Sequence, residues 1–249
     1  MSNILLLIKR ESLILKNNWL INVIILFISP ITIFSLIAMP LYRIMQRDGL
    51  DYLYWSMPGI YFICSSIVCM YFSISQIMKL KNTNNPSNSI LKSPISIWEV
   101  IIANFLSIII IGIIQLFIGI ITLNIINQGH YSLLSYFFVI INIIAFISFI
   151  TALNILFGLL INSELVMIFI IMIQFIIISF GMGSLIPIEL FPEQLSNIII
   201  NIPMVHIIIN TQSILMLEPI TLFASIITFI ISIVLLTIDT IIAYKVLRK

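Results

Sequence analysis

Few side chains in this sequence could carry out chemistry. The two histidines, His130 and His206, have no histidine, cysteine or carboxylate at ligand spacing, so no metal site is expected. Glu189 and Glu193 lie four residues apart, but Pro192 between them disfavours regular helix, and we expect both carboxylates to be solvated. No glycine-rich loop followed by Lys and Ser or Thr is present, and only eight glycines occur in total. We therefore expect no catalytic residues, no metal and no ATP site on this chain.

The remaining titratable and nucleophilic groups favour structural roles. Cys64 and Cys69 are five residues apart, which places them on different faces of a helix, so we expect two buried apolar side chains and no disulfide. Asp239 is the only ionisable residue well inside an apolar run, and we expect it near a membrane interface, hydrated or reaching Lys245. Carriers coupled to protons or ions usually hold ionisable groups near the membrane midplane. Their scarcity here argues against a carrier that supplies its own energy.

Long apolar runs dominate the chain. Of the 249 residues, 61% are hydrophobic and 8% are charged, whereas a soluble domain carries about 25% charged residues. A helix needs about 20 apolar residues to cross the hydrocarbon core of a bilayer. The fold class is therefore all-α: a single polytopic membrane domain over residues 1–249, with six transmembrane helices. The expected spans are about 19–41, 57–78, 98–124, 133–160, 165–186 and 218–244.

The distribution of Lys and Arg predicts the orientation of these spans. In a six-span chain, nine of the eleven basic residues fall on one side of the membrane and two on the other. The positive-inside rule then places both termini in the cytoplasm. The nine are Lys9, Arg10, Lys16, Lys79, Lys81, Lys92, Lys245, Arg248 and Lys249, and the two are Arg43 and Arg47. The small net charge of +2 gives no indication of nucleic acid binding.

Two features of the sequence leave alternatives open. Residues 1–18 form either a cytoplasmic helix at the membrane surface or the frayed start of the first span. Neutral polar residues inside the spans either hydrogen-bond between helices, which we favour, or line a substrate path. These residues are Asn104, Gln115, Thr122, Asn124, Asn142, Thr151, Asn154 and Gln174.

The two longer connections, 79–97 and 187–219, lie on opposite sides of the expected bundle. In the cytoplasmic one, Ser93 before Pro94 is typical of a helix start, and Ser96 with Glu99 fits a capping box. The external one is too apolar for a free loop, and three prolines break it at intervals too short for another span. We expect an external re-entrant or interfacial helical hairpin between spans five and six. The three prolines are Pro187, Pro192 and Pro203.

Three stretches, in this order, resemble the ABC-2-type exporter permeases. Residues 57–59, Met-Pro-Gly, resemble the start of the second span in that family. Residues 90–104 are similar to the leucine, small residue, proline pattern that follows this span. Residues 186–195 and 202–206 resemble the external signature between spans five and six. The chain departs from the family at Ile202, where Asn is frequent, and at Gln212, where Arg is frequent, so an arginine-dependent outer gate is not expected.

The resemblance implies the transmembrane subunit of an ATP-driven exporter. In that family a cytoplasmic helix after span two, here about 84–92, docks on a separate ATPase that binds ATP and Mg, and the N-terminal segment touches it as well. Two permease chains pair, as a homodimer or with a paralogue, and the external hairpins help to close the outer gate. The implied ATPase-coupling residues are Asn88, Ser89, Ile90, Leu91, Lys92, Ser93 and Pro94. The implied external-gate residues are Pro187, Glu189, Phe191, Pro192 and Pro203.

We therefore expect a multi-pass protein of a bacterial plasma membrane that moves a hydrophobic or amphipathic substrate outward. Lipids, lipid-linked glycans, drugs and peptides all suit the apolar spans with their scattered amides. Two copies of an ATP-binding subunit, a second permease and membrane lipid are the expected partners. The alternative is a membrane accessory or immunity subunit that binds a peptide or lipid without pumping it.

Overall fold

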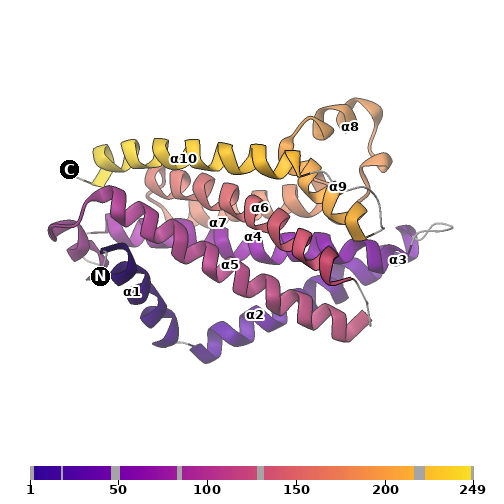
Figure 1. Cartoon of the computed structure of the whole chain (residues 1–249), viewed down its shortest axis with the longest axis horizontal. Coiled ribbons are helices and arrows are strands. Elements are labelled where there is room, and N and C mark those ends of the chain that lie inside the picture. The colour runs from indigo at the N-terminus through magenta and orange to yellow at the C-terminus, as the bar shows by residue number, and fades with distance from the viewer. Residues whose placement is uncertain are drawn as a thin grey trace.

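A computed structural model describes residues 3–17, 19–45, 51–82, 86–127, 132–215 and 222–247, and these are all helix, turn or irregular chain without a strand. The start of α1 and the end of α10 lie at the same end of an elongated helix bundle (Figure 1). We call this the terminal end, and the end that carries α3 and α8 the far end. Some of the residues named above lie outside the described ranges, among them Arg47, His130, Arg248 and Lys249.

Ten α-helices and four short 3-10 or π segments are present in the described ranges. In chain order they are α1 (Asn3–Asn17), α2 (Trp19–Ile33), η1 (Phe34–Ala38), α3 (Met39–Met45), α4 (Tyr52–Lys81), η2 (Pro86–Lys92), α5 (Ile97–Asn127), α6 (Leu133–Leu160), α7 (Glu164–Ile176), η3 (Ile177–Gly181), η4 (Ile188–Leu190), α8 (Glu193–Ile200), α9 (Pro203–Leu215) and α10 (Phe223–Leu247).

The prediction of six spans is confirmed for the described residues. Six helical stretches are long and apolar enough to cross a membrane: Asn22–Met45, Tyr52–Lys81, Ile97–Ile126, Leu134–Leu160, Glu164–Gly181 and Phe223–Leu247. The fifth was predicted to reach residue 186 but ends at Gly181, because the chain turns at Gly183, whose φ of 80° is in the left-handed region. The sixth begins at Phe223, within the predicted range.

Span two, helix α4, lies at the centre of the bundle. Within its most apolar window, 83% of the residues are buried, against 22% for the first span and 17% for the fifth. Close helix packing beside α4 depends on small residues: Gly158 on α6 lies so near α4 that an added Cβ would approach Ile77 Cβ to 2.9 Å. Cys64 and Cys69 are buried in α4 as free thiols, as predicted.

Hydrogen bonds between spans fasten α6, α9 and α10 together. The Asn142 amide donates to Thr211 Oγ1 at 3.0 Å, and Ser225 Oγ donates to Asn142 Oδ1 at 2.6 Å. On the other side of the bundle, Gln115 Nε2 donates to the carbonyl of Leu26 in α2 at 3.1 Å. The prediction that in-span amides bond between helices is therefore confirmed for Asn142 and Gln115.

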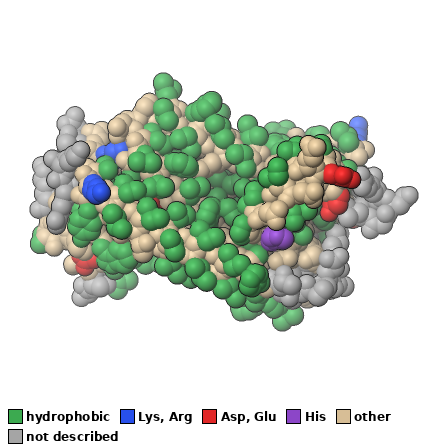
Figure 2. All heavy atoms as spheres, turned by 90° about the horizontal axis from the view of Figure 1, so that it is seen from above, with side chains coloured by type: hydrophobic (Ala, Val, Ile, Leu, Met, Phe, Trp, Pro, Cys, Tyr) green, Lys and Arg blue, Asp and Glu red, His purple; other side chains and the backbone are tan. Residues whose placement is uncertain are grey.

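The surface of the bundle is apolar between its two ends. Figure 2 shows hydrophobic side chains over most of the visible face, with the coloured charged side chains near the ends. The exposed large hydrophobic side chains lie mainly on α2, α5, α7 and α10. Such a belt is what a lipid-facing surface requires.

The N-terminal segment is a helix separate from the first span. Helix α1 packs against α5, and Leu7 is buried in a cluster with Ile97, Val100 and Ile101. Of the two alternatives for this segment, the separate helix is the one observed. In Figure 1, α1 and α2 run at an angle to each other along the outside of the bundle.

Candidate functional site

The predicted coupling residues 88–94 follow α4 at the terminal end. Residues 88–92 belong to the 3-10 segment η2, and Ser93 and Pro94 form a bend between η2 and α5. The resemblance implied a helix at about 84–92; the described part, Pro86–Lys92, is a 3-10 helix of seven residues. Ile90 packs against the apolar cluster that contains Leu80 and Ile97, whereas Leu91 is half-buried outside it. Ser89 and Lys92 belong to η2 as well.

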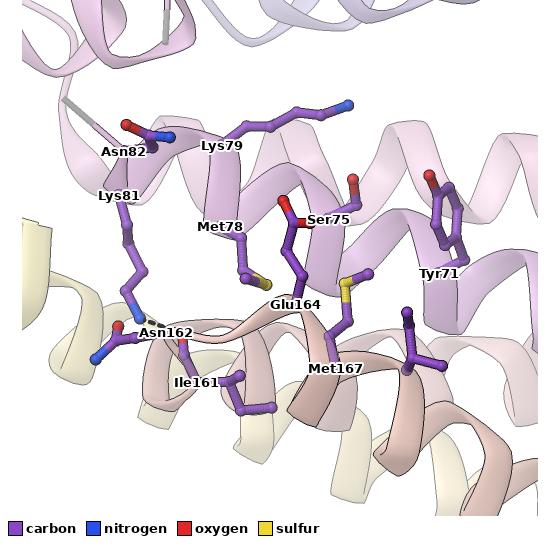
Figure 3. A pocket seen from close by; sticks show the side chains of 11 residues that line it. Tyr71, Ser75, Met78, Lys79, Lys81, Asn82, Ile161, Asn162, Glu164 and Met167 are labelled. Carbon is purple, nitrogen blue, oxygen red and sulfur yellow. Dashed lines mark hydrogen bonds between the residues drawn. The ribbon is translucent and has the colours of Figure 1, made fainter. Parts of the chain in front are cut away.

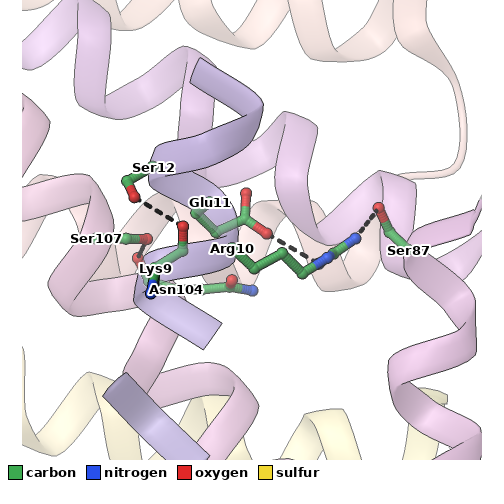
Figure 4. A network of polar contacts seen from close by, with 7 residues as sticks. All are labelled: Lys9, Arg10, Glu11, Ser12, Ser87, Asn104 and Ser107. Atoms are coloured by element: carbon green, nitrogen blue, oxygen red, sulfur yellow. Dashed lines mark hydrogen bonds and ion pairs between the residues drawn. The ribbon is translucent and has the colours of Figure 1, made fainter. Parts of the chain in front are cut away.

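Two polar contacts fix η2 to the helices beside it. Asn88 Nδ2 donates to the carbonyl of Leu80 in the last turn of α4 at 2.7 Å. Arg10 on α1 donates from Nη2 to Ser87 Oγ and from Nη1 to Glu11 Oε1, both at 3.0 Å (Figure 4). The segment is therefore joined to α1 and α4 at once, so a push on η2 acts on both helices.

Burial and nearby positive charge act in opposite directions on the pKa of Glu11 in this network. Burial raises the pKa of the Glu11 carboxyl, while the charges of Arg10 and Lys79 lower that pKa. Its side chain is 16% exposed and that of Arg10 is 32% exposed, so water screens their ion pair only in part. Glu11 thereby holds the Arg10 guanidinium in the position from which it reaches Ser87.

Helix α5 begins later than the Ser93-Pro94 pair predicts. Its first residue is Ile97, and Ser96 with Glu99 forms the predicted capping box: Glu99 Oε2 accepts from Ser96 N at 3.0 Å, and Ser96 Oγ accepts from Glu99 N at 3.3 Å. The start at Ser93 is wrong because Ser96 satisfies the free amides of the first turn, whereas Ser93 N donates to the carbonyl of Ile90. Asn3 on α1 also donates to Glu99 Oε1 at 3.1 Å.

A pocket of about 680 Å³ opens beside the terminal end of α4. In Figure 3, Glu164 and Met167 reach from α7 toward Ser75 and Met78 on α4, whereas Lys79 extends away from them. Both polar and apolar side chains form the wall, which suits an amphipathic molecule. The lining residues are Tyr71, Ser75, Met78, Lys79, Lys81, Asn82, Ile161, Asn162, Glu164, Met167 and Ile168.

Lys81 closes one side of this pocket. Its Nζ donates to the carbonyls of Gly158, Leu159 and Ile161, at 3.3, 2.9 and 2.6 Å. These carbonyls belong to the C-terminal end of α6, where a cation is favoured by the unpaired acceptors and the helix dipole. In the sequence, Lys81 contributes only to the predicted orientation of the spans. The spacing of residues gives no indication of hydrogen-bond acceptors 77 to 80 residues away.

The predicted gate residues gather at the far end. Pro187 precedes η4, Pro192 precedes α8, and Pro203 is the first residue of α9, so the prolines separate the short helices. Glu189 is exposed and Phe191 is half-buried. These residues and residues 88–94 lie at opposite ends of the bundle (Figure 1).

Sequence reasoning missed the loop that joins η3 to η4. Tyr52 Oη donates to the Leu185 carbonyl at 2.7 Å, and Gln212 Nε2 donates to the Gly183 carbonyl at 3.0 Å. Gly59 approaches the same loop so closely that an added Cβ would lie 1.9 Å from Ser184 O. We call residues 183–185 the clamped loop, because α4 and α9 hold it from two sides. Gln212, one of the two departures from the family pattern, thus has a defined structural role.

Asp239 contradicts its predicted environment. Its side chain on α10 is completely buried, and neither carboxylate oxygen accepts a hydrogen bond from a described residue, so it is neither exposed nor paired with Lys245. The prediction placed it by distance along one helix and did not account for the neighbouring helices that cover it. Within the described part of the chain, no three His, Cys, Asp or Glu side chains gather in a way that could hold a metal ion.

The family model of the ABC-2 type transporter matches residues 2–216, so the chain belongs to this family. It is a transmembrane permease component of an ABC-2 type transporter, a transporter subunit that lacks the ATPase domain. In this family the ATPase activity lies on a separate subunit, and membership implies a partnership with such an ATP-binding subunit. No curated protein and no solved structure matches the chain.

Proposed function

We propose that this permease exports a hydrophobic or amphipathic substrate from the cytoplasm or the inner leaflet, with energy from two copies of an ATP-binding subunit. The mixed wall of the pocket between α4 and α7 supports an amphipathic substrate, such as a lipid, a lipid-linked glycan, a drug or a peptide. Family membership supports ATP-driven transport. The membrane is a bacterial plasma membrane, and the terminal end faces the cytoplasm, as the excess of Lys and Arg at that end favours.

The ATP-binding subunit contacts residues 88–94 and moves them during its catalytic cycle. The observation that carries this proposal is the double attachment of η2, through Asn88 to α4 and through Ser87 to Arg10 on α1. Since α4 crosses the whole bundle, a displacement at η2 reaches the clamped loop at the far end through one continuous helix. Pro187, Glu189, Phe191, Pro192 and Pro203 belong to the external gate that this movement opens.

A second permease, identical or related, completes the conduit. Span five buries only 17% of its most apolar window inside this chain, which leaves α7 with a broad apolar face. The pocket beside α7 lies next to this face, so a partner chain there would complete its wall.

Paired variants at the terminal end test the coupling role. Leu91→Asp places a charge on η2 at a half-buried residue outside the apolar cluster, and Ser163→Asp places the same charge at an exposed residue in the turn between α6 and α7 that does not line the pocket. Each permease variant is co-expressed with the ATP-binding subunit, and co-purification, ATPase activity in lipid nanodiscs and export are measured. We expect Leu91→Asp, and likewise deletion of 88–92, to abolish export and stimulated ATPase activity while insertion and folding persist. Ser163→Asp should behave like the wild type.

Normal export by the Leu91→Asp variant would contradict the coupling role of η2. If no ATP-binding subunit co-purifies with the wild-type chain, the alternative of a non-pumping accessory or immunity subunit gains support instead. Measuring Tm for both variants separates a loss of coupling from a loss of fold.

A further inference from the structure

A second hollow lies on the outside of the bundle and borders the pocket between α4 and α7, since Tyr71 lines both. It has a volume of about 460 Å³ and is formed by the end of α1, the first turns of α2 and the middle of α4 and α5. Its inner wall is apolar and includes Leu26, Ile67, Phe72 and Ile111. We call it the α2 groove. Its volume lies within the range of ordinary small-ligand sites, about 300–1,000 Å³.

The α2 groove changes character at the end formed by α1. Lys16, in the last turn of α1, and Trp19, at the start of α2, line this end, and both are exposed. Trp and Lys at the end of an apolar segment are typical of the boundary between hydrocarbon and headgroups. Among the described lining residues there is no carboxylate, and Glu11 on the same helix is paired with Arg10. The groove therefore has a cationic end and an apolar interior.

We propose that the α2 groove binds one acyl chain of an anionic phospholipid, with the phosphate against Lys16. An apolar hollow on a membrane-spanning surface is filled by hydrocarbon, and a bilayer supplies acyl chains at this depth. The charge of Lys16 then selects the headgroup. The proposal rests on the orientation proposed above, which places Lys16 beside the anionic cytoplasmic leaflet.

The expected selectivity follows from a single basic residue. One Lys near an anionic surface contributes about 1 kcal/mol, which corresponds to about a fivefold preference for an anionic over a zwitterionic lipid. The acyl chain adds little to this preference because both lipids carry one. The bound lipid would brace α2 against α4 and α5, next to the two hydrogen bonds that Gln115 Nε2 on α5 donates to the Leu26 carbonyl and Ser29 Oγ on α2.

Quenching of tryptophan fluorescence by lipids with brominated acyl chains tests the proposal. The chain has three tryptophans, so Trp55→Phe with Trp98→Phe leaves Trp19 as the reporter in the groove. The matched control retains Trp98, which is exposed on α5 but does not line the groove. Each protein is reconstituted in phosphatidylcholine vesicles with rising fractions of brominated phosphatidylglycerol or brominated phosphatidylcholine.

We expect Trp19 to be quenched at about a fivefold lower fraction of the phosphatidylglycerol, and Trp98 to show no such preference. Lys16→Gln should abolish the preference, whereas Lys245→Gln, at the terminal end of another span, should leave it unchanged. Ile111→Phe, which fills the groove, should weaken quenching of Trp19 by both lipids.

Equal quenching of Trp19 by the two lipids in the wild-type background would overturn the proposal. If a protein covers the groove, neither lipid will quench Trp19, and position 19 will crosslink to a second copy of the chain. This pair of results would overturn the proposal as well. The quenching assay needs no ATP and no ATP-binding subunit. Its outcome therefore does not depend on the outcome of the coupling experiment.

Discussion

Gly59→Ala is expected to disrupt the far end of the bundle, because α4 touches the clamped loop there without a side chain between them. The added Cβ would lie 1.9 Å from Ser184 O and 2.7 Å from Ser184 C. An ordinary contact needs at least 3.4 Å, so the loop must withdraw by about 1.5 Å. The obstacle is backbone, which cannot turn aside as a flexible side chain would.

The expected loss of stability follows from the contacts that hold the clamped loop in place. Overpacking a well-packed site costs roughly 1–3 kcal/mol, and a loop that withdraws also weakens the bonds from Tyr52 and Gln212. Each such bond contributes about 0.5–1.5 kcal/mol, whereas replacing a helical glycine by alanine stabilises by up to about 1 kcal/mol. A net loss of about 2 kcal/mol corresponds to a Tm decrease of about 4–8 °C for a chain of this size.

Thermal unfolding of the purified protein, followed by intrinsic fluorescence, measures this change. Gly119→Ala on α5 is the matched control, because its added Cβ would meet only Tyr61 Cδ1, at an ordinary 3.4 Å. The control should keep the wild-type Tm or exceed it. If Gly59→Ala is as stable as Gly119→Ala, the close approach of α4 to the clamped loop is wrong.

Three further experiments test individual contacts. Asn142→Ala, combined with Thr211→Val in a double-mutant cycle, should give a coupling energy of about 0.6 kcal/mol and at most about 1.7; additive effects would argue against the bond. Lys81→Met removes the donor to three carbonyls of α6 and should lower Tm, whereas Lys79→Met should not; equal Tm values would argue against this contact. Asp239→Asn replaces a buried carboxylate without partners among the described residues, so Tm should stay or rise; a marked decrease would reveal a ligand for the carboxylate.

The sequence predicted the elements that depend on local composition. Six apolar runs gave the six spans, because their length and hydropathy are properties of each segment alone. The capping box at Ser96 and Glu99 was readable for the same reason: its partners are three residues apart. The resemblance to the permease family likewise rested on short local patterns, and the family model confirms it.

The features that sequence reasoning missed depend on contacts between distant segments. Lys81 meets α6 across 77 or more residues, and the burial of Asp239 depends on helices that its own span does not reveal. The clamped loop requires Gly59, Gly183 and Gln212 to meet from three parts of the chain. The overlong prediction of span five overlooked the turn at Gly183, and the misplaced start of α5 overlooked that Ser96 and not Ser93 caps the helix.

The burial of both thiols has a practical consequence for measuring how the permease moves. Cys64 is 1% exposed and Cys69 is 0% exposed, so water-soluble maleimides have no native target among the described residues. A single cysteine introduced at Leu91 or Glu189 would therefore carry a spin label or fluorophore without prior removal of native thiols. The interior packing of the labelled protein would be unaltered. Pairs of such labels would then report distance changes at either end of the bundle during ATP turnover.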